Sequence, residues 1–296
     1  WALDLTLNPD FSQIESDEPQ VTVNERFEVQ FPERRPFFIE NADFFSTDSN
    51  LVFTRRIVDP EGGIRLTGRS GDYGFGSILI NDAAPGLNKE AGDSLRGEKA
   101  NIAIIRGFRD LGEQDRVGFL ATERRLEDGY NRVLSLDGRF KFTDNWFSQM
   151  QLIGTESEPT NGDETSTGYQ RNIMINREGR TYSNHTHFIE TSSDFRTELG
   201  FQRRWYKPNT SGVHQRSGLN FYPENSLLNR WGGSIFGVYL ENQKNEKIYT
   251  QLQPTIDLRF ETTELEVSWT DIEEILMPGD FPGLNTVRSY DYDTWQ

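Results

Sequence analysis

The chain has 296 residues, with 31 Lys and Arg against 47 Asp and Glu, which gives a formal net charge of −16 at pH 7. This acidity argues against a nucleic-acid partner, because phosphate contacts need Lys and Arg. Aromatic residues make up 12% of the chain and cysteine is absent, which argues against disorder and excludes disulfides, thiolate metal sites and cysteine nucleophiles. The longest apolar run has four residues, Ile102 to Ile105, and is too short for a transmembrane helix.

The first sixty residues are the least regular part of the chain. We predict two strands in it, Leu3–Leu7 and Leu51–Ile57. The stretch Phe31–Phe45 between them is poor strand material, because it contains two prolines and the doublets Phe37–Phe38 and Phe44–Phe45, which break alternation. We expect this stretch to pack on the protein without joining a strand ladder.

From residue 63 onward the dominant period of the sequence is two. In residues 134–143 apolar or glycine positions alternate with polar ones, and residues 248–261 repeat this arrangement. Such alternation is typical of half-buried strands, and no long stretch carries a helical apolar stripe. We predict an all-β protein with roughly fourteen strands, most of them about 9–14 residues long.

Matching the apolar faces of neighbouring strands predicts the turns between them. A three-residue loop at Thr143–Asn145 sets Phe142 opposite Trp146. Two-residue turns are predicted at Glu178–Gly179 and at Thr262–Thr263.

The connections between the predicted strands alternate in length. The short connection 71–72 is followed by the long 82–98, the short 110–115 by the longer 127–131, and the alternation continues if residues 191–211 form one excursion. This alternation is typical of an up-and-down transmembrane β-barrel, in which tight periplasmic turns alternate with longer extracellular loops. Pro254, inside a predicted strand, argues against this interpretation, and a soluble, secreted β-protein such as a sandwich pair or solenoid is the alternative.

We therefore predict an antiparallel up-and-down transmembrane β-barrel, of which the chain is a fragment. The chain begins at Trp1 without Met or a leader, and residues 290–296 resemble the opening of another segment. Residues 1–62 are expected to supply N-terminal strands and a segment rich in Pro, Arg and Phe. Residues 63–296 are expected to supply the hairpins of the same domain.

The stretch Phe31–Phe45 is a candidate plug or gate of this barrel, within its lumen or under its periplasmic mouth. Its two arginines are expected to pair with carboxylates on the lumen-facing side of the strands. The alternative is a constant packing element that closes the bottom of the barrel. The candidate residues are Arg34, Arg35, Phe37, Phe38 and Glu40.

Two histidines come nearest to a metal site. His185 and His187 are two residues apart, so they share one face of a strand, which the predicted register places opposite Asn172 and Gln170 on the polar, lumen side. A metal site needs a third ligand, and Glu190 falls on the other face. We therefore expect no metal and interpret His185, His187, Asn172 and Gln170 as polar residues of the lumen.

No catalytic residue or cofactor is predicted. The acidic loop Glu156–Glu164 offers oxygen ligands for Ca²⁺ but lacks the pattern of a calcium-binding loop, so we expect a solvated loop. A Gly-x-Ser-x-Gly motif is absent, no pair of carboxylates stands out among the 47 acidic residues, and the glycine-rich stretch Gly71–Gly76 falls between two strands.

Three segments, residues 5–17, 31–40 and 51–57, resemble a family of Gram-negative outer-membrane β-barrels of unassigned function. The resemblance is most specific in Phe31–Glu40, with the sequence FPERRPFFIE. Members of this family usually carry a domain like the family 9 carbohydrate-binding modules upstream of the barrel, and this chain does not include that domain. The resemblance implies a location in the outer membrane, with lipid as a partner, and implies no chemistry.

We expect an outer-membrane β-barrel that binds or passes an extracellular ligand, with a saccharide as the class that the family context implies. The alternatives are a cell-surface enzyme acting on polysaccharide and a structural protein of the envelope. The membrane interpretation requires that the apolar faces of residues 134–142 and 252–260 point outward and not into a closed core.

Overall fold

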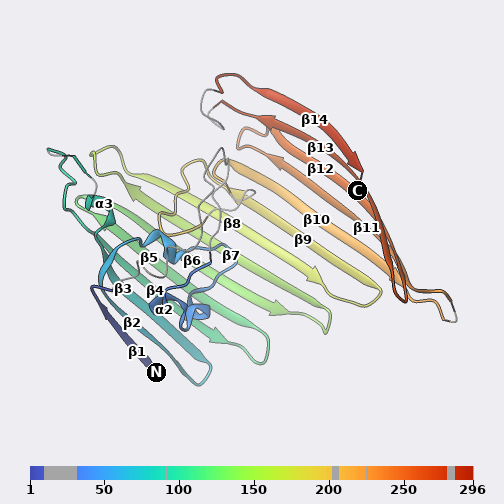
Figure 1. Ribbon diagram of the computed structural model, residues 1–296, viewed down its shortest axis with the longest axis horizontal. Helices are drawn as coiled ribbons and strands as arrows, with labels where there is room; N and C mark the ends of the chain where they lie inside the picture. The colour runs from blue at the N-terminus through green and yellow to red at the C-terminus, as the bar shows by residue number, and fades with distance from the viewer. Residues whose placement is uncertain are drawn as a thin grey trace. The chain divides into compact units, whose positions relative to one another are not determined.

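The computed structural model describes residues 1–9, 32–87, 89–90, 92–201, 207–224, 226–278 and 284–295 (Figure 1). These residues form one antiparallel, up-and-down sheet of 14 strands, in which every strand pairs with its neighbours in sequence. The strands β1 and β14 stand at the two ends of this order, and no ladder joins them in the described part of the chain. The predicted all-β class and antiparallel up-and-down order are confirmed.

Most strands are long. Their bounds are β1 Ala2–Leu7, β2 Pro60–Ser70, β3 Tyr73–Asp82, β4 Ala100–Asp110, β5 Arg116–Leu126, β6 Gly129–Lys141, β7 Trp146–Glu158, β8 Ser166–Arg177, β9 Tyr182–Thr191, β10 Thr210–Phe221, β11 Leu228–Glu241, β12 Lys247–Phe260, β13 Glu264–Leu276 and β14 Arg288–Trp295. The helices are single turns: α2 Pro36–Ile39, η1 Ala42–Phe45, η2 Thr54–Arg56 and α3 Ala84–Leu87. Within the described ranges, none of the helices has the length and apolarity to span a bilayer.

One predicted strand is wrong. Residues Leu51–Ile57 pair with no strand, and the stretch contains the 3-10 turn η2. Leu51 and Ile57 are buried in two separate hydrophobic clusters, so the apolar positions that suggested a strand are explained by packing on the sheet. The predicted excursion between two strands at 191–211 is confirmed at its ends, since β9 ends at Thr191 and β10 begins at Thr210.

The predicted turns are confirmed at one hairpin, widened at a second and displaced at a third. Phe142 N donates to Trp146 O over 2.9 Å, which closes the predicted three-residue loop. The connection between β8 and β9 spans residues 178–181, wider than the predicted turn. Between β12 and β13, Phe260 N donates to Thr263 O over 2.8 Å, so the turn lies one residue earlier than predicted. This displacement moves the register by two residues and leaves every side chain on its predicted face.

The predicted alternation of connection lengths holds only in part. The connection between β5 and β6 is residues 127–128, where a longer one was predicted, because Gly129 and Tyr130 already belong to β6. The long connections 83–99, 192–209 and 277–287 all follow odd-numbered strands, as does the connection from β1 to β2. In an antiparallel up-and-down sheet these connections therefore emerge at one end of the strands.

The two faces of the sheet differ in polarity and in exposure, and the apolar one is exposed. In β6, Leu134 and Leu136 are 57% and 56% exposed, whereas Ser135 between them is 0% exposed. In β12, Leu252 and Ile256 are exposed and Thr255 is buried. We call the two sides the apolar face and the polar face. Buried side chains of the polar face include Arg65, Thr67, Arg106, Thr122, Asn131, Ser135, Gln151, Thr155, Gln170, Asn172, His187, His214, Thr255, Ser268 and Thr270.

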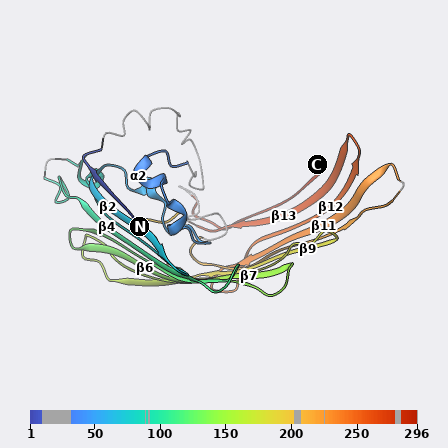
Figure 2. The same cartoon turned by 90° about the horizontal axis from the view of Figure 1, so that it is seen from below.

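The chain divides into two compact units. The first consists of residues 1–138, 151–170 and 194–208, and the second of residues 139–150, 171–193 and 209–296. In the first unit, residues 32–57, which we call the N-terminal segment, lie on the polar face of the sheet (Figure 2). Residues 194–201 lie there too, so close that a Cβ on Gly168 of β8 would come within 2.4 Å of Phe195 Cα.

The core of the first unit lies between these two segments and the sheet. Phe38 and Phe45 of the N-terminal segment pack with Leu199 against isoleucines of β3 and β4. Leu51 packs with Phe195 against Leu120, Val133 and Ile153 of β5, β6 and β7. The polar face therefore carries an apolar patch where the N-terminal segment covers it.

Candidate functional site

A buried arginine of the sheet holds the N-terminal segment in place. The side chain of Arg65 on β2 is 1% exposed, and its guanidinium donates to the backbone carbonyls of Phe37 and Glu40 at the end of α2. The last carbonyls of a helix have no partner within it, so Arg65 satisfies acceptors that would otherwise be orphaned. The same guanidinium pairs with Asp4 Oδ2 at 2.8 Å and lies 3.4 Å from Glu40 Oε2.

A second buried arginine ties the two ends of the N-terminal segment together. Arg35 Nε and Nη2 donate to the Glu33 carboxylate over 2.8 and 2.7 Å, and its Nη1 and Nη2 donate to the carbonyls of Ile57 and Thr54 over 2.6 and 2.8 Å. Its guanidinium also lies 4.4 Å from the centre of the Phe38 ring. These bonds stabilise the segment's own fold.

The other predicted plug residues fall into two groups. Phe38 is buried in the core, and Phe37 packs edge-on against it with ring centres 5.1 Å apart. Arg34 is exposed, and the side chain of Glu40 is 65% exposed. The sequence predicts that Arg34 and Arg35 pair with carboxylates of the strands. Arg35 instead bonds to Glu33 of its own segment. The arginine that crosses from the sheet to the segment is Arg65, which the sequence analysis did not single out.

The middle of the N-terminal segment is bonded to polar side chains of the sheet. Ser49 N donates to Gln151 Oε1 over 2.7 Å, and Ser49 Oγ donates to Gln170 Oε1 over 2.5 Å. Gln151 Nε2 in turn donates to Ser135 Oγ over 2.8 Å. Buried polar chains of this kind are costly to break. They fix the middle of the N-terminal segment to β7 and β8.

The ion pair inside the segment predicts a pH dependence. Burial raises the pKa of the Glu33 carboxyl, but hydrogen bonds from Arg35 and Thr54 outweigh it and lower the pKa from 4.5 to about 2. A carboxyl with a lowered pKa in the folded state stabilises the protein above its unfolded pKa and loses this effect as the pH falls to the folded value. We expect Glu33 to contribute about 3 kcal/mol at neutral pH, lost between about pH 4.5 and pH 2.

The comparison with Glu33→Gln isolates this contribution, because other acidic groups titrate in both proteins. The difference in free energy of unfolding between the two proteins, measured by denaturant titration, is expected to shrink as the pH falls through that range. A difference that stays constant with pH would contradict the assignment.

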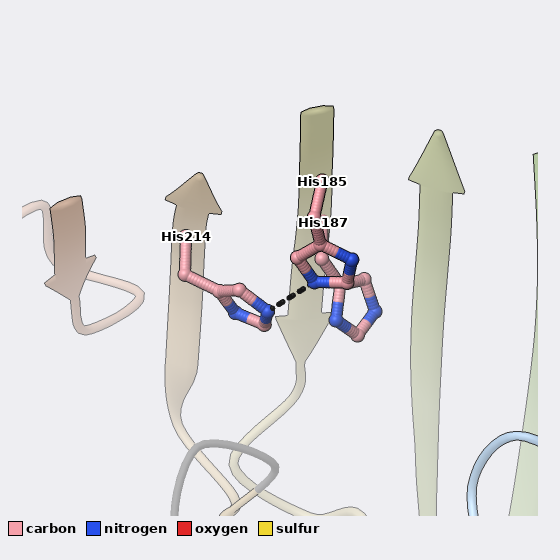
Figure 3. Close-up of side chains that lie close together, drawn as sticks. All are labelled: His185, His187 and His214. Carbon is pink, nitrogen blue, oxygen red and sulfur yellow. Dashed lines mark hydrogen bonds between the residues drawn. The ribbon is translucent and has the colours of Figure 1, made fainter. Parts of the chain in front are cut away.

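The second unit carries a cluster of histidines on its polar face. The chain has three histidines, and all of them meet here: His185 and His187 on β9 and His214 on β10 (Figure 3). His187 and His214 are directly opposite each other in the antiparallel register. One ring nitrogen from each histidine lies within 4.8 Å of the others, and the Nε2 atoms of His185 and His214 are 2.9 Å apart.

An asparagine sets the protonation of one of these rings. His185 Nδ1 lies 2.6 Å from Asn176 Oδ1, and an amide oxygen only accepts, so His185 Nδ1 carries the proton. When His185 is neutral, its Nε2 is then the acceptor toward His214 Nε2, which donates. Asn176 therefore turns the lone pair of His185 Nε2 toward the middle of the cluster.

The predicted lumen residues lie on the polar face, in different surroundings. His187 and Asn172 are buried in the second unit, whereas Gln170 is buried in the first unit under Ser49. Glu190 is on the opposite face of β9, 3.4 Å from Arg171 Nη1, and takes no part in the cluster. The third member of the cluster, His214, was missed by the sequence analysis.

The signal for His214 is present in the sequence but incomplete. His214 belongs to a strand whose polar positions alternate with Val213 and Leu219 on the other face, so its face follows from period two. Its register against β9 does not follow, because the connection 192–209 is too long to fix strand pairing as a tight turn does.

Comparisons with known proteins reach only the first part of the chain. No curated protein and no solved structure matches the chain. Residues 1–65 match the model of a family described as a domain of unknown function (DUF5916). The matched range includes β1, the N-terminal segment and Arg65, which agrees with the resemblance of this region to a family of unassigned function.

Proposed function

We propose that the chain forms the wall of an outer-membrane β-barrel, with its apolar face against lipid and its polar face toward a lumen. One observation carries this proposal: from β1 to β13, one face of the sheet bears exposed apolar side chains, while the other face bears buried polar side chains beside the apolar ones that pack under the N-terminal segment. Large exposed apolar patches are rare on monomeric soluble proteins and mark contacts with membranes or partners. The exposed apolar residues include Leu3, Leu5, Ile64, Leu79, Ile105, Phe119, Leu134, Leu136, Leu152, Ile173, Phe188, Leu219, Ile235, Leu252, Ile256, Leu265 and Val267.

Strand length supports the same proposal. The strands from β2 to β13 have 10 to 14 residues, and a tilted strand needs about 9–11 residues to cross the hydrocarbon core. A bilayer tolerates a sheet only when its edges are paired, because unpaired backbone groups are costly in lipid. The proposed barrel therefore requires that the edges at β1 and β14 be closed.

In this barrel the N-terminal segment fills part of the lumen. It lies on the polar face and is part of the connection from β1 to β2, which emerges at the same end as the longest connections. Longer connections of outer-membrane barrels are extracellular, so we propose that the segment enters the lumen from the outer side. The polar face of the second unit is proposed to line the remaining path.

For the function of the barrel we propose the binding or passage of a polar extracellular ligand, with saccharides as the class that the family resemblance implies. The test is the flux of saccharides of increasing size into vesicles that contain the purified chain. We expect flux above that of empty vesicles, falling with solute size. Flux no greater than that of empty vesicles would overturn the passage of solutes, while recovery of the protein outside the outer-membrane fraction of cells would overturn its location.

A further inference from the structure

The histidine cluster brings together every imidazole of the chain. Three histidines among 296 residues are scarce, and here they lie beside Val238, Arg216 and Phe236 on the same face. Their convergence on one point is therefore a specific feature of this face. The cluster places three imidazole rings, from two paired strands, around one point.

The distances within the cluster suit a small cation. In a tetrahedral zinc site with Zn–N bonds of about 2.0–2.1 Å, the nitrogens lie about 3.3 Å from one another. The Nε2 atoms of His185 and His214 are 2.9 Å apart, and the candidate ligand atoms of all three rings lie within 4.8 Å of each other. An ion bound between the three rings would take the place of the hydrogen bond between His185 and His214. Only the histidine side chains would have to move to accommodate it.

The tautomer of His185 matches what a metal ligand needs. A metal-bound histidine typically donates its other ring N–H to an oxygen, which fixes the ring orientation and makes the ligating nitrogen more basic. Asn176 Oδ1, 2.6 Å from His185 Nδ1, is such an oxygen. With Nδ1 protonated, His185 offers Nε2 to the ion.

The donor set also selects the kind of ion. Imidazole suits Zn²⁺, Cu²⁺ and Ni²⁺, whereas Ca²⁺ and Mg²⁺ prefer oxygen. Arg216, the register partner of His185, lies on the same face. Its guanidinium donates to Ser234 Oγ on β11 over 3.5 Å. With three protein ligands, a fourth position stays open to water or to a ligand oxygen.

We propose that His185, His187 and His214 form a binding site for a first-row divalent transition ion such as Zn²⁺, with Asn176 as the residue that orients His185. The site does not depend on whether the sheet closes into a barrel, because its ligands come from the paired strands β9 and β10. It departs from the expectation that no metal binds here, which rested on a missing third ligand, because His214 supplies that ligand.

The test uses the full chain, purified with an affinity tag that contains no histidine and stripped with a chelator. Zn²⁺ is titrated in competition with a chromogenic chelator. X-ray absorption at the zinc edge then reports the ligands. Because the cluster holds every histidine of the chain, an imidazole signal arises from this site alone. We expect one equivalent of Zn²⁺ with three imidazole nitrogens at about 2.0 Å.

Substitutions distinguish the site from general binding to the acidic surface. Each of His185→Ala, His187→Ala and His214→Ala is expected to weaken Zn²⁺ binding by at least tenfold, and Asn176→Ala by about 10–100-fold. The matched control is Thr186→Ala, between the two histidines of β9 but on its other face, with no expected change. Absence of stoichiometric binding, or binding that the histidine substitutions leave unchanged in folded protein, would overturn the proposal.

Discussion

Replacing Leu136 by Arg is expected to lower the free energy of unfolding of the protein in a lipid bilayer by about 2–4 kcal/mol. Leu136 lies near the middle of β6 on the apolar face, where the proposed barrel contacts the centre of the hydrocarbon core. Charge is costly at that depth because lipid cannot solvate it. In water the same change at an exposed position would alter stability by only about 0.5 kcal/mol. The measurement is denaturant unfolding from lipid vesicles.

The matched control for this prediction is Phe142→Arg. Phe142 is 65% exposed and Leu136 is 56% exposed, so exposure in the free chain does not distinguish them. Phe142 lies just beyond the end of β6, where the proposed barrel reaches the interface, and Arg is expected to cost about 0–1 kcal/mol there. Equal small effects at both positions would contradict burial of the apolar face in lipid.

Replacing Arg65 by Ala is expected to destabilise the protein by about 2–4 kcal/mol, because it removes a buried guanidinium that bonds to several acceptors at once. The change leaves Asp4 and two carbonyls at the end of α2 without the guanidinium that they share. Since Arg65 links the sheet to the N-terminal segment, amide hydrogens of residues 36–45 are expected to exchange faster than in the unaltered protein. Denaturant unfolding and hydrogen exchange measure the two effects.

Arg69→Ala is the control for Arg65, because both arginines are on β2 and both pair with an aspartate. The Arg69 side chain is 48% exposed and its Nη1 lies 2.9 Å from Asp110 Oδ2. An exposed ion pair is worth about 0–1 kcal/mol, so little change is expected in stability or in exchange of the N-terminal segment. If Arg65→Ala lowers the free energy of unfolding no more than Arg69→Ala does, the proposed role of Arg65 in holding the N-terminal segment is contradicted.

Much of the fold follows from period two alone. The alternation in residues 134–143 predicts a strand and its two faces, and the three-residue loop before Trp146 follows from matching these faces across a hairpin. The turn between β12 and β13 shows the limit, since a turn placed one residue late still gives the right faces with the wrong register. Periodicity specifies the face of a residue, and only the turn geometry specifies its partner.

The candidate site exceeds what local patterns can predict. Leu51–Ile57 has the composition of a strand, but its apolar side chains are used in packing across the sheet, which outweighs local propensity. Arg65 looks like any polar residue of a strand until the end of α2 is known to lie above it. His214 meets His187 across a pairing whose register is set by the whole sheet.

The orientation of the apolar face is tested most directly with single cysteines, because the chain contains none of its own. Cysteines are placed in β12 at Leu252 and Ile256 on the apolar face and at Gln251 and Gln253 on the polar face. An environment-sensitive fluorophore is attached before folding into vesicles that contain lipids with quenching groups on their acyl chains. We predict strong quenching at 252 and 256 and little at 251 and 253. Quenching that is absent at 252 and 256, or that shows no alternation along the strand, would contradict the account.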